Sequence, residues 1–371
     1  MTPRTAPFAN ARRLAIKLGS SLLVDADGAP RRAWLAALVG EVAAMRREGR
    51  AVILVSSGAI ALGSRRLRLP KGGRASLEDA QAAAAVGQIA LAGLYAELFA
   101  AHGLAAAQLL LTADDLDDRR RHMNAAATLD RLLGVGAVPV INENDSVATE
   151  EIRFGDNDRL AARVALAAQA DALILFSQID GLYTADPARE PGARLIPTVA
   201  SADAVRADTR GRSGMGTGGM EAKLIAARLA TRGGIAVAIA DGRPVAPLAR
   251  FLDCGHGTVF EAIGNAGARK AWMIGRTHTA GRVTVDAGAA GALAEGASLL
   301  AAGIVRVDGE FARGAVIEVA APDGTPLARG LSAYDALEIA ALAGKRSDVH
   351  AAILGYAPRA AVIHRDQMVR A

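Results

Sequence analysis

The sequence predicts an α/β protein in which a mainly parallel sheet is sandwiched between helices and followed by a small, mostly-β domain. Up to Phe260, apolar segments of strand length alternate with helical segments, as in parallel sheets covered on both faces. After Phe260, short apolar segments are separated by Gly and Asp turns. Since 51% of the residues are hydrophobic but only 4% are aromatic, the core must consist of Ala, Leu, Val and Ile.

The length of 371 residues exceeds that of a typical single domain of about 150 residues. We expect a first domain over residues 1–262, a polar, Gly-containing linker over 263–275, and a second domain over 276–371.

The expected elements follow from apolar runs and helical periodicity. In the first domain we expect strands at Leu14–Leu18, Ala51–Val55, Ala105–Leu111, Val138–Ile141, Asp171–Phe176 and Ile235–Ala240. We expect helices at Arg31–Glu48, Glu78–Ala101, Met123–Leu133 and Arg159–Gln169, and one ending at Ala230. In the second domain the apolar segments are Arg282–Val285, Gly303–Val307, Val316–Val319 and Ala361–His364.

Composition excludes several classes of protein. The single cysteine, Cys254, rules out a disulfide within the chain and favours a reducing cytoplasm. The six histidines are scattered without metal-ligand spacing, and the net charge of +5 does not by itself imply nucleic acid.

The basic N-terminus lacks the apolar core of a secretory signal. Gln88 and Glu97 interrupt the apolar stretch Ala82–Leu111, so we expect a buried, Ala-rich helix and no membrane contact.

Only five of the 43 basic residues are lysines, which makes their positions informative. Lys17 ends a predicted strand and precedes Gly19 and two serines, while Lys223 follows the Gly-rich segment Thr217–Gly219 at the start of a helix. Lysine binds phosphate as a compact point charge, and Gly-rich turns before helices present backbone N–H groups to anions. The second segment differs from the Walker pattern G-x-x-x-x-G-K-[ST].

The stretch Val140–Asp158 is the densest set of amides and carboxylates in the chain. It follows a predicted strand, where α/β enzymes place ligand-binding groups. An alternative interpretation is a solvated acidic loop, with Asp156 or Asn157 capping the next helix.

The segment Ser56–Gly63 also follows a predicted strand. Its small residues would let a ligand approach the backbone closely. Because it lacks the G-x-S-x-G pattern of a nucleophilic serine, we favour ligand binding there.

Taken together, these segments resemble the amino acid kinase family, and within it the branch that phosphorylates glutamate and carries a C-terminal PUA domain. The resemblance covers nearly the whole chain. The matching segments are Lys17-Leu18-Gly19-Ser20, Ser56-Ser57-Gly58-Ala59, Val140-Ile141-Asn142-Glu143-Asn144-Asp145, Gly155-Asp156-Asn157-Asp158, Asp180-Gly181-Leu182-Tyr183-Thr184-Ala185-Asp186-Pro187 and Thr217-Gly218-Gly219-Met220 with Lys223.

The resemblance implies ATP-dependent phosphorylation of the γ-carboxylate of L-glutamate, the first step toward proline. Phosphoryl transfer requires positioning and neutralisation of charge. By resemblance, Lys17 and Lys223 supply that charge from opposite sides, and Asp158 orients both lysines. A glutamate carboxylate is already a nucleophile, so no general base is required.

The resemblance also assigns binding residues, all within the first domain. Ser57, Gly58, Asp145 and Asn157 match positions that hold glutamate, with Asn142 and Asp156 supporting that site. The ATP site would comprise Lys17, Ser177, Gln178, Thr217, Gly218, Gly219, Met220 and Lys223. The chain differs from the family at Gln178, where Asp is usual, and at Ala222, where Thr is common. Mg²⁺ is implied with ATP, but the sequence assigns no ligand to it.

Further expectations concern partners. The family implies proline as a feedback inhibitor at the glutamate pocket, a homo-oligomer, and glutamyl phosphate reductase as a channelling partner. The tail from Lys270 to Ala371 has 11 basic and 10 acidic residues, which is a poor electrostatic footprint for RNA, so we expect a structural or regulatory PUA domain. Two alternatives stay open: a family member with another acceptor, such as aspartate, acetylglutamate or a nucleoside monophosphate, and an RNA-binding protein with an inactive kinase-like part.

Overall fold

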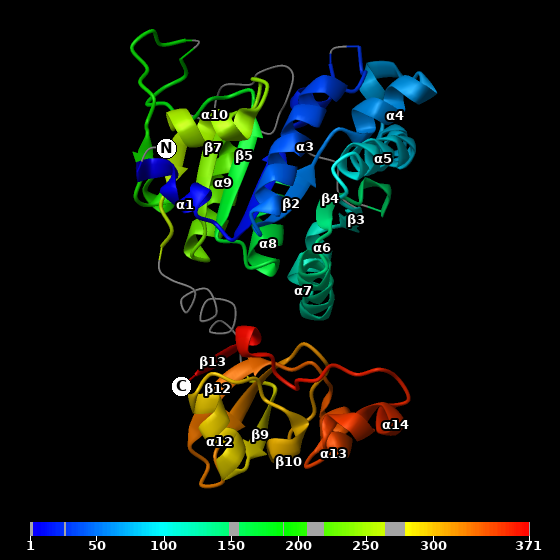
Figure 1. Cartoon of the computed structure of the whole chain (residues 1–371), viewed down its shortest axis with the longest axis vertical. Helices are drawn as coiled ribbons and strands as arrows, with labels where there is room; N and C mark the ends of the chain where they lie inside the picture. Colours follow the sequence, from blue (N-terminus) through cyan, green and yellow to red (C-terminus); the bar gives the residue numbers. More distant parts are fainter. Residues whose placement is uncertain are drawn as a thin grey trace. The chain divides into compact units, whose positions relative to one another are not determined.

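The computed structural model describes residues 3–25, 27–147, 156–187, 189–205, 219–263 and 279–370, with the side chain of Asp156 outside the description. The chain divides into two compact units, Met1–Ile263 and Gly264–Ala371, which we describe separately (Figure 1). Apart from Ile263, the predicted linker lies outside the described residues.

The first unit is built on an eight-stranded sheet with the order β3-β4-β2-β1-β5-β7-β8-β6. All neighbouring strands pair in parallel except β7 and β8. The predicted fold class is therefore confirmed. The strands are β1 (Arg13–Leu18), β2 (Ala51–Ser56), β3 (Ala106–Leu111), β4 (Val138–Glu143), β5 (Ala172–Ser177), β6 (Thr198–Val199), β7 (Ala236–Asp241) and β8 (Thr258–Phe260).

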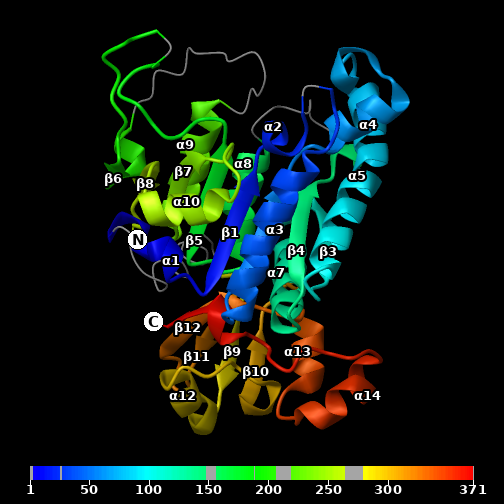
Figure 2. The same ribbon diagram turned by 45° about the horizontal axis from the view of Figure 1, so that its top comes forward.

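Helices cover both faces of this sheet, as Figure 2 shows. On one face, α3 (Arg32–Arg47) packs against α5 (Leu77–Ala100) and α10 (Pro247–Cys254), which contacts α1 (Ala6–Ala9). On the other face, α8 (Asp156–Ala167) packs between α7 (Arg119–Gly134) and α9 (Met220–Arg232). The shorter helices are α2 (Ser20–Leu23), α4 (Ala59–Leu67) and α6 (Ala113–Asp117). The buried core under α3 consists mostly of Leu, Val, Ile and Ala, as the composition predicts.

Two helices begin earlier than the apolar pattern predicts. Asp118 accepts a hydrogen bond from the backbone N–H of Arg121 at 2.8 Å, which caps α7 four residues before the predicted start at Met123. Helix α8 begins at Asp156 rather than Arg159, so Asn157 lies inside its first turn and is not the cap residue. In both cases the polar first turn carries no apolar periodicity.

Helices α4 and α5 cross with their backbones in contact. A Cβ atom added to Gly63 would lie 1.7 Å from the carbonyl oxygen of Ala83, and one added to Gly87 would lie 1.7 Å from that of Ala59. Helix α4 starts after Gly58, which has a φ of 103° and connects it to β2. The crossing thus fixes where the β2–α4 turn lies.

Helix α5 was predicted to be buried, and this is correct for one face only. Ile89, at the middle of α5, is 74% exposed. An 18-residue stretch of this helix has a mean hydropathy of 1.5, and only 39% of the stretch is buried. By length and composition alone, α5 could cross a membrane. This is weak support for a span, because core helices of soluble proteins pass the same test and α5 packs against α4, α3 and β3.

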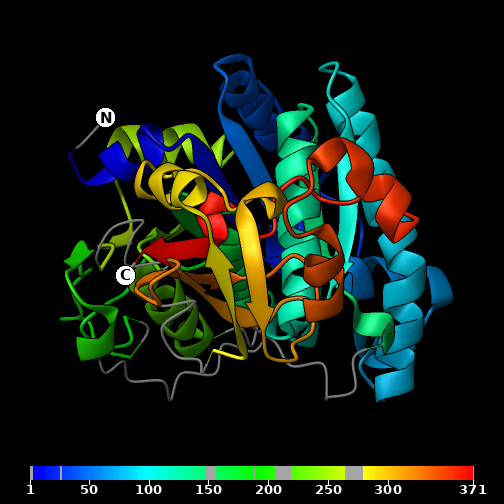
Figure 3. The ribbon, with the colours of Figure 1, turned by 90° about the horizontal axis from the view of Figure 1, so that it is seen from below.

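The second unit is a five-stranded sheet with the order β10-β9-β11-β12-β13 (Figure 3, yellow to red). Its strands are β9 (Gly281–Val285), β10 (Ile304–Asp308), β11 (Val316–Ala320), β12 (Pro326–Leu331) and β13 (Met368–Arg370). The helices α12 (Ala287–Ala294), α13 (Ala336–Leu342) and α14 (His350–Leu354) complete it.

Some predictions for the second unit were incomplete. The segment Ala361–His364 forms no strand, and Ile363 makes only an isolated bridge with Leu299. Strand β12 was missed because Pro326 and Gly330 weaken its pattern. Gly330 is required there, since a Cβ would lie 2.4 Å from the side chain of Ile363.

We expect Gly63→Ala to lower the free energy of unfolding by about 1–3 kcal/mol, because a methyl group would force α4 and α5 apart. The matched control is Gly93→Ala, also in a helix, where a Cβ meets nothing within 4 Å. That change should be neutral or stabilise by up to about 1 kcal/mol. Urea unfolding of both variants tests this; equal stability of the two would contradict a backbone contact at Gly63.

Candidate functional site

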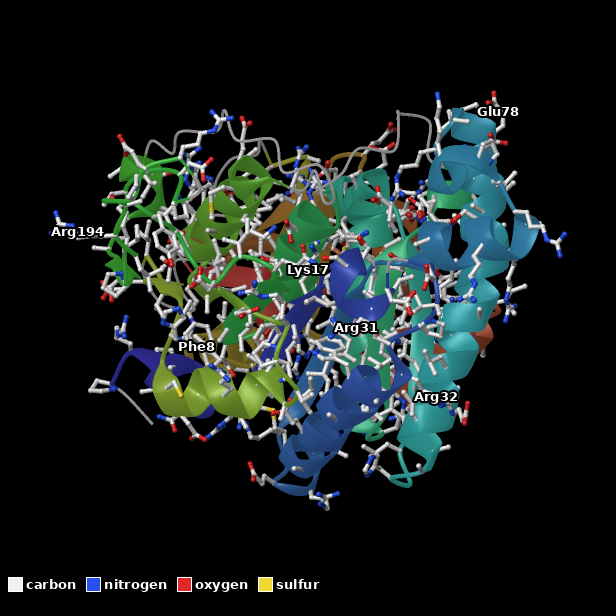
Figure 4. The ribbon with its side chains drawn as sticks, turned by 90° about the horizontal axis from the view of Figure 1, so that it is seen from above. Phe8, Lys17, Arg31, Arg32, Glu78 and Arg194 are labelled. Atoms are coloured by element: carbon white, nitrogen blue, oxygen red, sulfur yellow. The ribbon has the colours of Figure 1, made fainter. Side chains whose placement is uncertain are left out.

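Three charged side chains meet at the carboxyl ends of the central strands. Lys17 lies in β1, Asp158 in α8 and Lys223 in the first turn of α9. The Nζ atom of Lys17 lies 2.7 Å from Oδ1 of Asp158, and Nζ of Lys223 lies 3.0 Å from Oδ2. The three side chains are 7%, 0% and 4% exposed. Figure 4 shows Lys17 near the middle of the first unit. We call these residues the lysine–aspartate cluster.

Burial and charge act in opposite directions in this cluster. Burial lowers the pKa of Lys17, while the neighbouring carboxylate of Asp158 acts to raise it. Burial alone would raise the pKa of Asp158, but Lys17 and Lys223 outweigh that effect and lower it. Since two cations share one carboxylate, the ionised cluster carries a net charge of +1 and suits an anionic ligand.

A second group of polar side chains follows the neighbouring strands β2 and β4. The strand register pairs Lys17 with Val55 and Val55 with Ile141, so the ends of β1, β2 and β4 lie side by side. Ser57 and Gly58 form the turn after β2, and Asn142 is the last residue but one of β4. Ser57, Gly58 and Asn142 therefore lie at the same edge of the sheet as Lys17.

Asn142 is buried, and its side-chain amide makes two hydrogen bonds. Its Nδ2 donates to Oε1 of Gln88 on α5 at 2.8 Å, and its Oδ1 accepts from the backbone N–H of Glu143 at 2.9 Å. Asp145, which follows β4, is 7% exposed. Asn142, Asp145 and Asp158 are all buried, so the alternative of a solvated acidic loop is wrong for these three residues.

Sequence reasoning missed several side chains of α5, and of the segment before it, that lie next to the candidate site residues. Gln88 was noted only as an interruption of an apolar helix, although a lone amide on an Ala-rich face was the available signal. Arg74 lies near Asp145: burial lowers the pKa of Arg74, and the charge of Asp145 acts to raise it. The hydroxyl groups of Tyr95 and Ser56 lie 3.0 Å apart beneath the β2–α4 turn.

The other side of the lysine–aspartate cluster is formed by the ends of β5 and β7. Ser177 pairs with Asp241 in the register, and its Oγ accepts from the backbone N–H of Ile179 at 3.1 Å. Asp180 accepts from the hydroxyl of Tyr183 at 3.0 Å and lies 2.9 Å from Nε2 of His256. These contacts fix the loop that follows β5.

Some candidate residues lie outside the description. Thr217 and Gly218 are not among the described residues, and neither is the side chain of Asp156. Gly219 is the cap residue of α9, and Met220 begins it. The Oδ1 atom of Asn157 is buried and finds no hydrogen-bond partner among the described residues.

The described residues do not fit a dedicated metal site. Within the described ranges, no group of three or more His, Cys, Asp or Glu side chains could hold a metal ion. Both oxygens of Asp158 contact lysines. Mg²⁺ commonly binds through substrate phosphates and few protein ligands, so a metal would depend on its substrate here.

We expect Asp158→Asn to lower the free energy of unfolding by about 3–5 kcal/mol, because two buried lysines lose their counter-charge. Asp130→Asn, which removes an exposed partner of Arg13, should cost less than about 1 kcal/mol. The pKa of Asp158 is lowered in the folded state, so its contribution is present above the ordinary value of 3.8 and is lost as pH falls further. Unfolding of both variants at pH 7 and pH 3 measures this; a difference independent of pH would contradict it.

Comparison with known proteins adds an independent finding. Residues 12–241 match the model of the amino acid kinase family, and residues 281–354 match that of the PUA domain. Glutamate 5-kinase from Novosphingobium aromaticivorans is 62% identical over 96% of this chain and 95% of its own. The enzymes of the same name from Sphingopyxis alaskensis and Zymomonas mobilis are 57% and 53% identical over 98% and 91% of their lengths, and 98% and 97% of this chain.

Solved structures also match part of the chain. A UMP kinase from Bacillus anthracis aligns with 68% of this chain and 97% of its own, at 16% identity and a TM-score of 0.47.

Proposed function

The chain belongs to the amino acid kinase family, and we propose that it transfers the γ-phosphoryl group of ATP to the side-chain carboxylate of L-glutamate. The observation that carries this proposal is the buried lysine–aspartate cluster at the carboxyl edge of the sheet. The glutamate 5-kinases that match almost the full chain support the choice of acceptor.

The cluster suits phosphoryl transfer because that reaction depends on positioning and charge stabilisation. A carboxylate oxygen of glutamate attacks the γ-phosphorus, the bond to the leaving oxygen breaks, and ADP departs with its electron pair. The products are ADP and an acyl phosphate. No proton must be removed, since the attacking carboxylate is already ionised. Lys17 and Lys223 would contact the transferred group from two sides.

Asp158 would serve the reaction by favouring the charged form of Lys17 and by holding both lysine side chains in place. Burial favours the neutral form of Lys17, and Asp158 opposes this. The two lysines contact different oxygens of one carboxylate, so their ammonium groups are held close together at fixed positions. A planar, rotationally restricted carboxylate therefore sets the spacing of both charges.

The acceptor would bind along β2 and β4. Ser57, Gly58, Asp145 and Asn157 would hold glutamate, with Asp145 pairing with the α-ammonium group, and Asn142 and Asp156 would support them. The burial of Asp145 and the free Oδ1 of Asn157 among the described residues support these roles, because buried polar atoms ordinarily have a partner. Arg74, beside Asp145, adds a positive charge suited to the α-carboxylate of the same substrate.

The nucleotide would bind on the β5 side, through Lys17, Ser177, Gln178, Thr217, Gly218, Gly219, Met220 and Lys223. Gly219 precedes α9, a helix of 13 residues whose N-terminal N–H groups and dipole favour phosphate. Mg²⁺ would accompany the nucleotide's phosphates. A cytoplasmic location agrees with the single cysteine, Cys254.

The proposal includes a homo-oligomer and glutamyl phosphate reductase as a channelling partner. Direct transfer to a reductase would protect an acyl phosphate from water. The exposed apolar face of α5 around Ile89 supports self-association, since such patches are frequent at interfaces. We expect a structural or regulatory role for the PUA domain and no RNA binding.

We expect L-glutamate and ATP to yield an acyl phosphate that hydroxylamine traps as a hydroxamate. Lys223→Ala should lower this rate at least about 100-fold, because transition-state charge is no longer stabilised. Lys345→Ala, an exposed lysine of the second unit, is the matched control and should retain full activity. Turnover only with aspartate, acetylglutamate or a nucleoside monophosphate would overturn the substrate, and no turnover with any acceptor would overturn the activity.

We further expect proline to inhibit by occupying the glutamate pocket near Asp145. Initial rates at several glutamate concentrations should show a raised apparent KM and an unchanged kcat, because the two ligands exclude each other. Inhibition that persists at saturating glutamate would place proline elsewhere.

A further inference from the structure

A cavity of about 520 Å³ lies in the first unit, away from the lysine–aspartate cluster. Arg32 at the start of α3, Arg65 and Arg66 in the last turn of α4, and Arg68 just after it line the cavity, together with Glu97 of α5. Figure 4 shows Arg32 between α3 and α5. We call this cavity the arginine pocket.

The charge in the arginine pocket is largely uncompensated. Among the described residues that line the arginine pocket, Glu97 is the one carboxylate, and it forms an ion pair with Arg32. Within the described parts of the chain, Arg65, Arg66 and Arg68 form no ion pair with an acidic side chain. The nearby carboxylate of Asp25 accepts backbone N–H groups of its own loop through Oδ1, at 3.0 Å from Asp27 and 2.8 Å from Ala29.

Helix stability accounts for only part of this arrangement. Basic residues in the last turn of a helix interact favourably with its dipole, which explains Arg65 or Arg66 taken alone. It does not explain why neighbouring arginines face one cavity, where like charges repel. It also does not explain Arg32, which comes from the opposite end of another helix. A cavity that gathers like charges from two elements is suited to an anion.

The floor of the arginine pocket is apolar. Leu62 of α4 is 6% exposed and Leu94 of α5 is 8% exposed, and Ala90 lies beside them. Small-molecule sites commonly have volumes of about 300–1,000 Å³, with apolar walls and a few convergent polar groups. The arginine pocket has this size and this distribution of polar groups.

The geometry points to a binding site for a small multivalent phosphate anion in the arginine pocket. The planar guanidinium group of arginine pairs with phosphate through two parallel hydrogen bonds, and it keeps its charge at all physiological pH values. Phosphate groups would lie against Arg65, Arg66 and Arg68 and compete with Glu97 for Arg32, while the rest of the molecule covers Leu62 and Leu94.

This site is separate from the one proposed for catalysis. None of the arginines belongs to the proposed ATP or glutamate sites. Its α4 arginine residues lie in the last turn of the helix and just after it, about 10–15 Å along the helix from the Gly58 turn at its start, given a rise of about 1.5 Å per residue. The inference therefore does not depend on the proposed function.

Calorimetric titration of the full chain with inorganic pyrophosphate tests the inference. We expect binding by the native protein and a dissociation constant raised at least about 10-fold in Arg65→Gln/Arg66→Gln, because charged hydrogen bonds are lost. Glutamine keeps the helix-forming stem, and circular dichroism confirms the fold. Arg32→Gln, on a different helix, should weaken binding in the same direction.

Two controls separate the arginine pocket from other sources of binding. Arg47→Gln removes an exposed arginine from the last turn of α3 and should leave pyrophosphate affinity unchanged. Lys223→Ala removes charge from the lysine–aspartate cluster, which is proposed to hold the phosphates of ATP, so it measures any pyrophosphate bound there; the weakening caused by Arg65→Gln/Arg66→Gln should persist in its presence. Loss of binding in Lys223→Ala but not in Arg65→Gln/Arg66→Gln would assign pyrophosphate to the catalytic site and overturn the inference.

Other outcomes would overturn it as well. These are no binding by the native protein, or equal weakening in Arg47→Gln, which would indicate general surface charge. A single-stranded RNA that displaces pyrophosphate and binds more tightly would make the patch a nucleic-acid surface instead.

Discussion

The contact of one buried carboxylate with two buried ammonium groups is the constraint on which the rest of the first unit depends. Removing three charges from water is costly, and their mutual attraction offsets that cost only when the geometry is good. The protein meets this requirement by taking each residue from a different rigid element: a central strand and the first turns of two adjacent helices. The packing of α8 on α9 and on β1 therefore sets the spacing of the charges.

The order of the strands explains how distant segments share this edge. Strand β1 lies between β2 and β5, so the turn that follows Lys17 has the proposed acceptor side on one flank and the proposed nucleotide side on the other. All these strands run parallel, and their carboxyl ends therefore open on the same side. Two substrates that approach from opposite flanks would meet above β1, where the net positive charge lies.

The sequence was sufficient to predict the fold class, because apolar runs identify strands. Rare lysines beside Gly-rich turns stand out in an Arg-rich chain, and this singled out Lys17 and Lys223. That Asp158 orients both lysines was implied only by the resemblance to the amino acid kinase family. Gln88 and Arg74 were not predicted, since their positions depend on how α4 and α5 cross, which periodicity does not specify. The short strands β6 and β8 and the Pro-containing β12 were missed because tertiary pairing, rather than local propensity, forms them.

The crossing of α4 and α5 restricts which acceptors the proposed site can bind, because it limits how far the two helices can move. Packed helices ordinarily slide past one another by small rearrangements of their side chains. Where main chain meets main chain, at Gly63 and Gly87, no side chain lies between them that could absorb such a movement. The Gly58 turn and the amide of Gln88 are carried by this pair of helices, so their separation is dictated by backbone geometry. The dimensions of the proposed acceptor side are therefore set by the backbone and change little with the rotamers of the side chains around it.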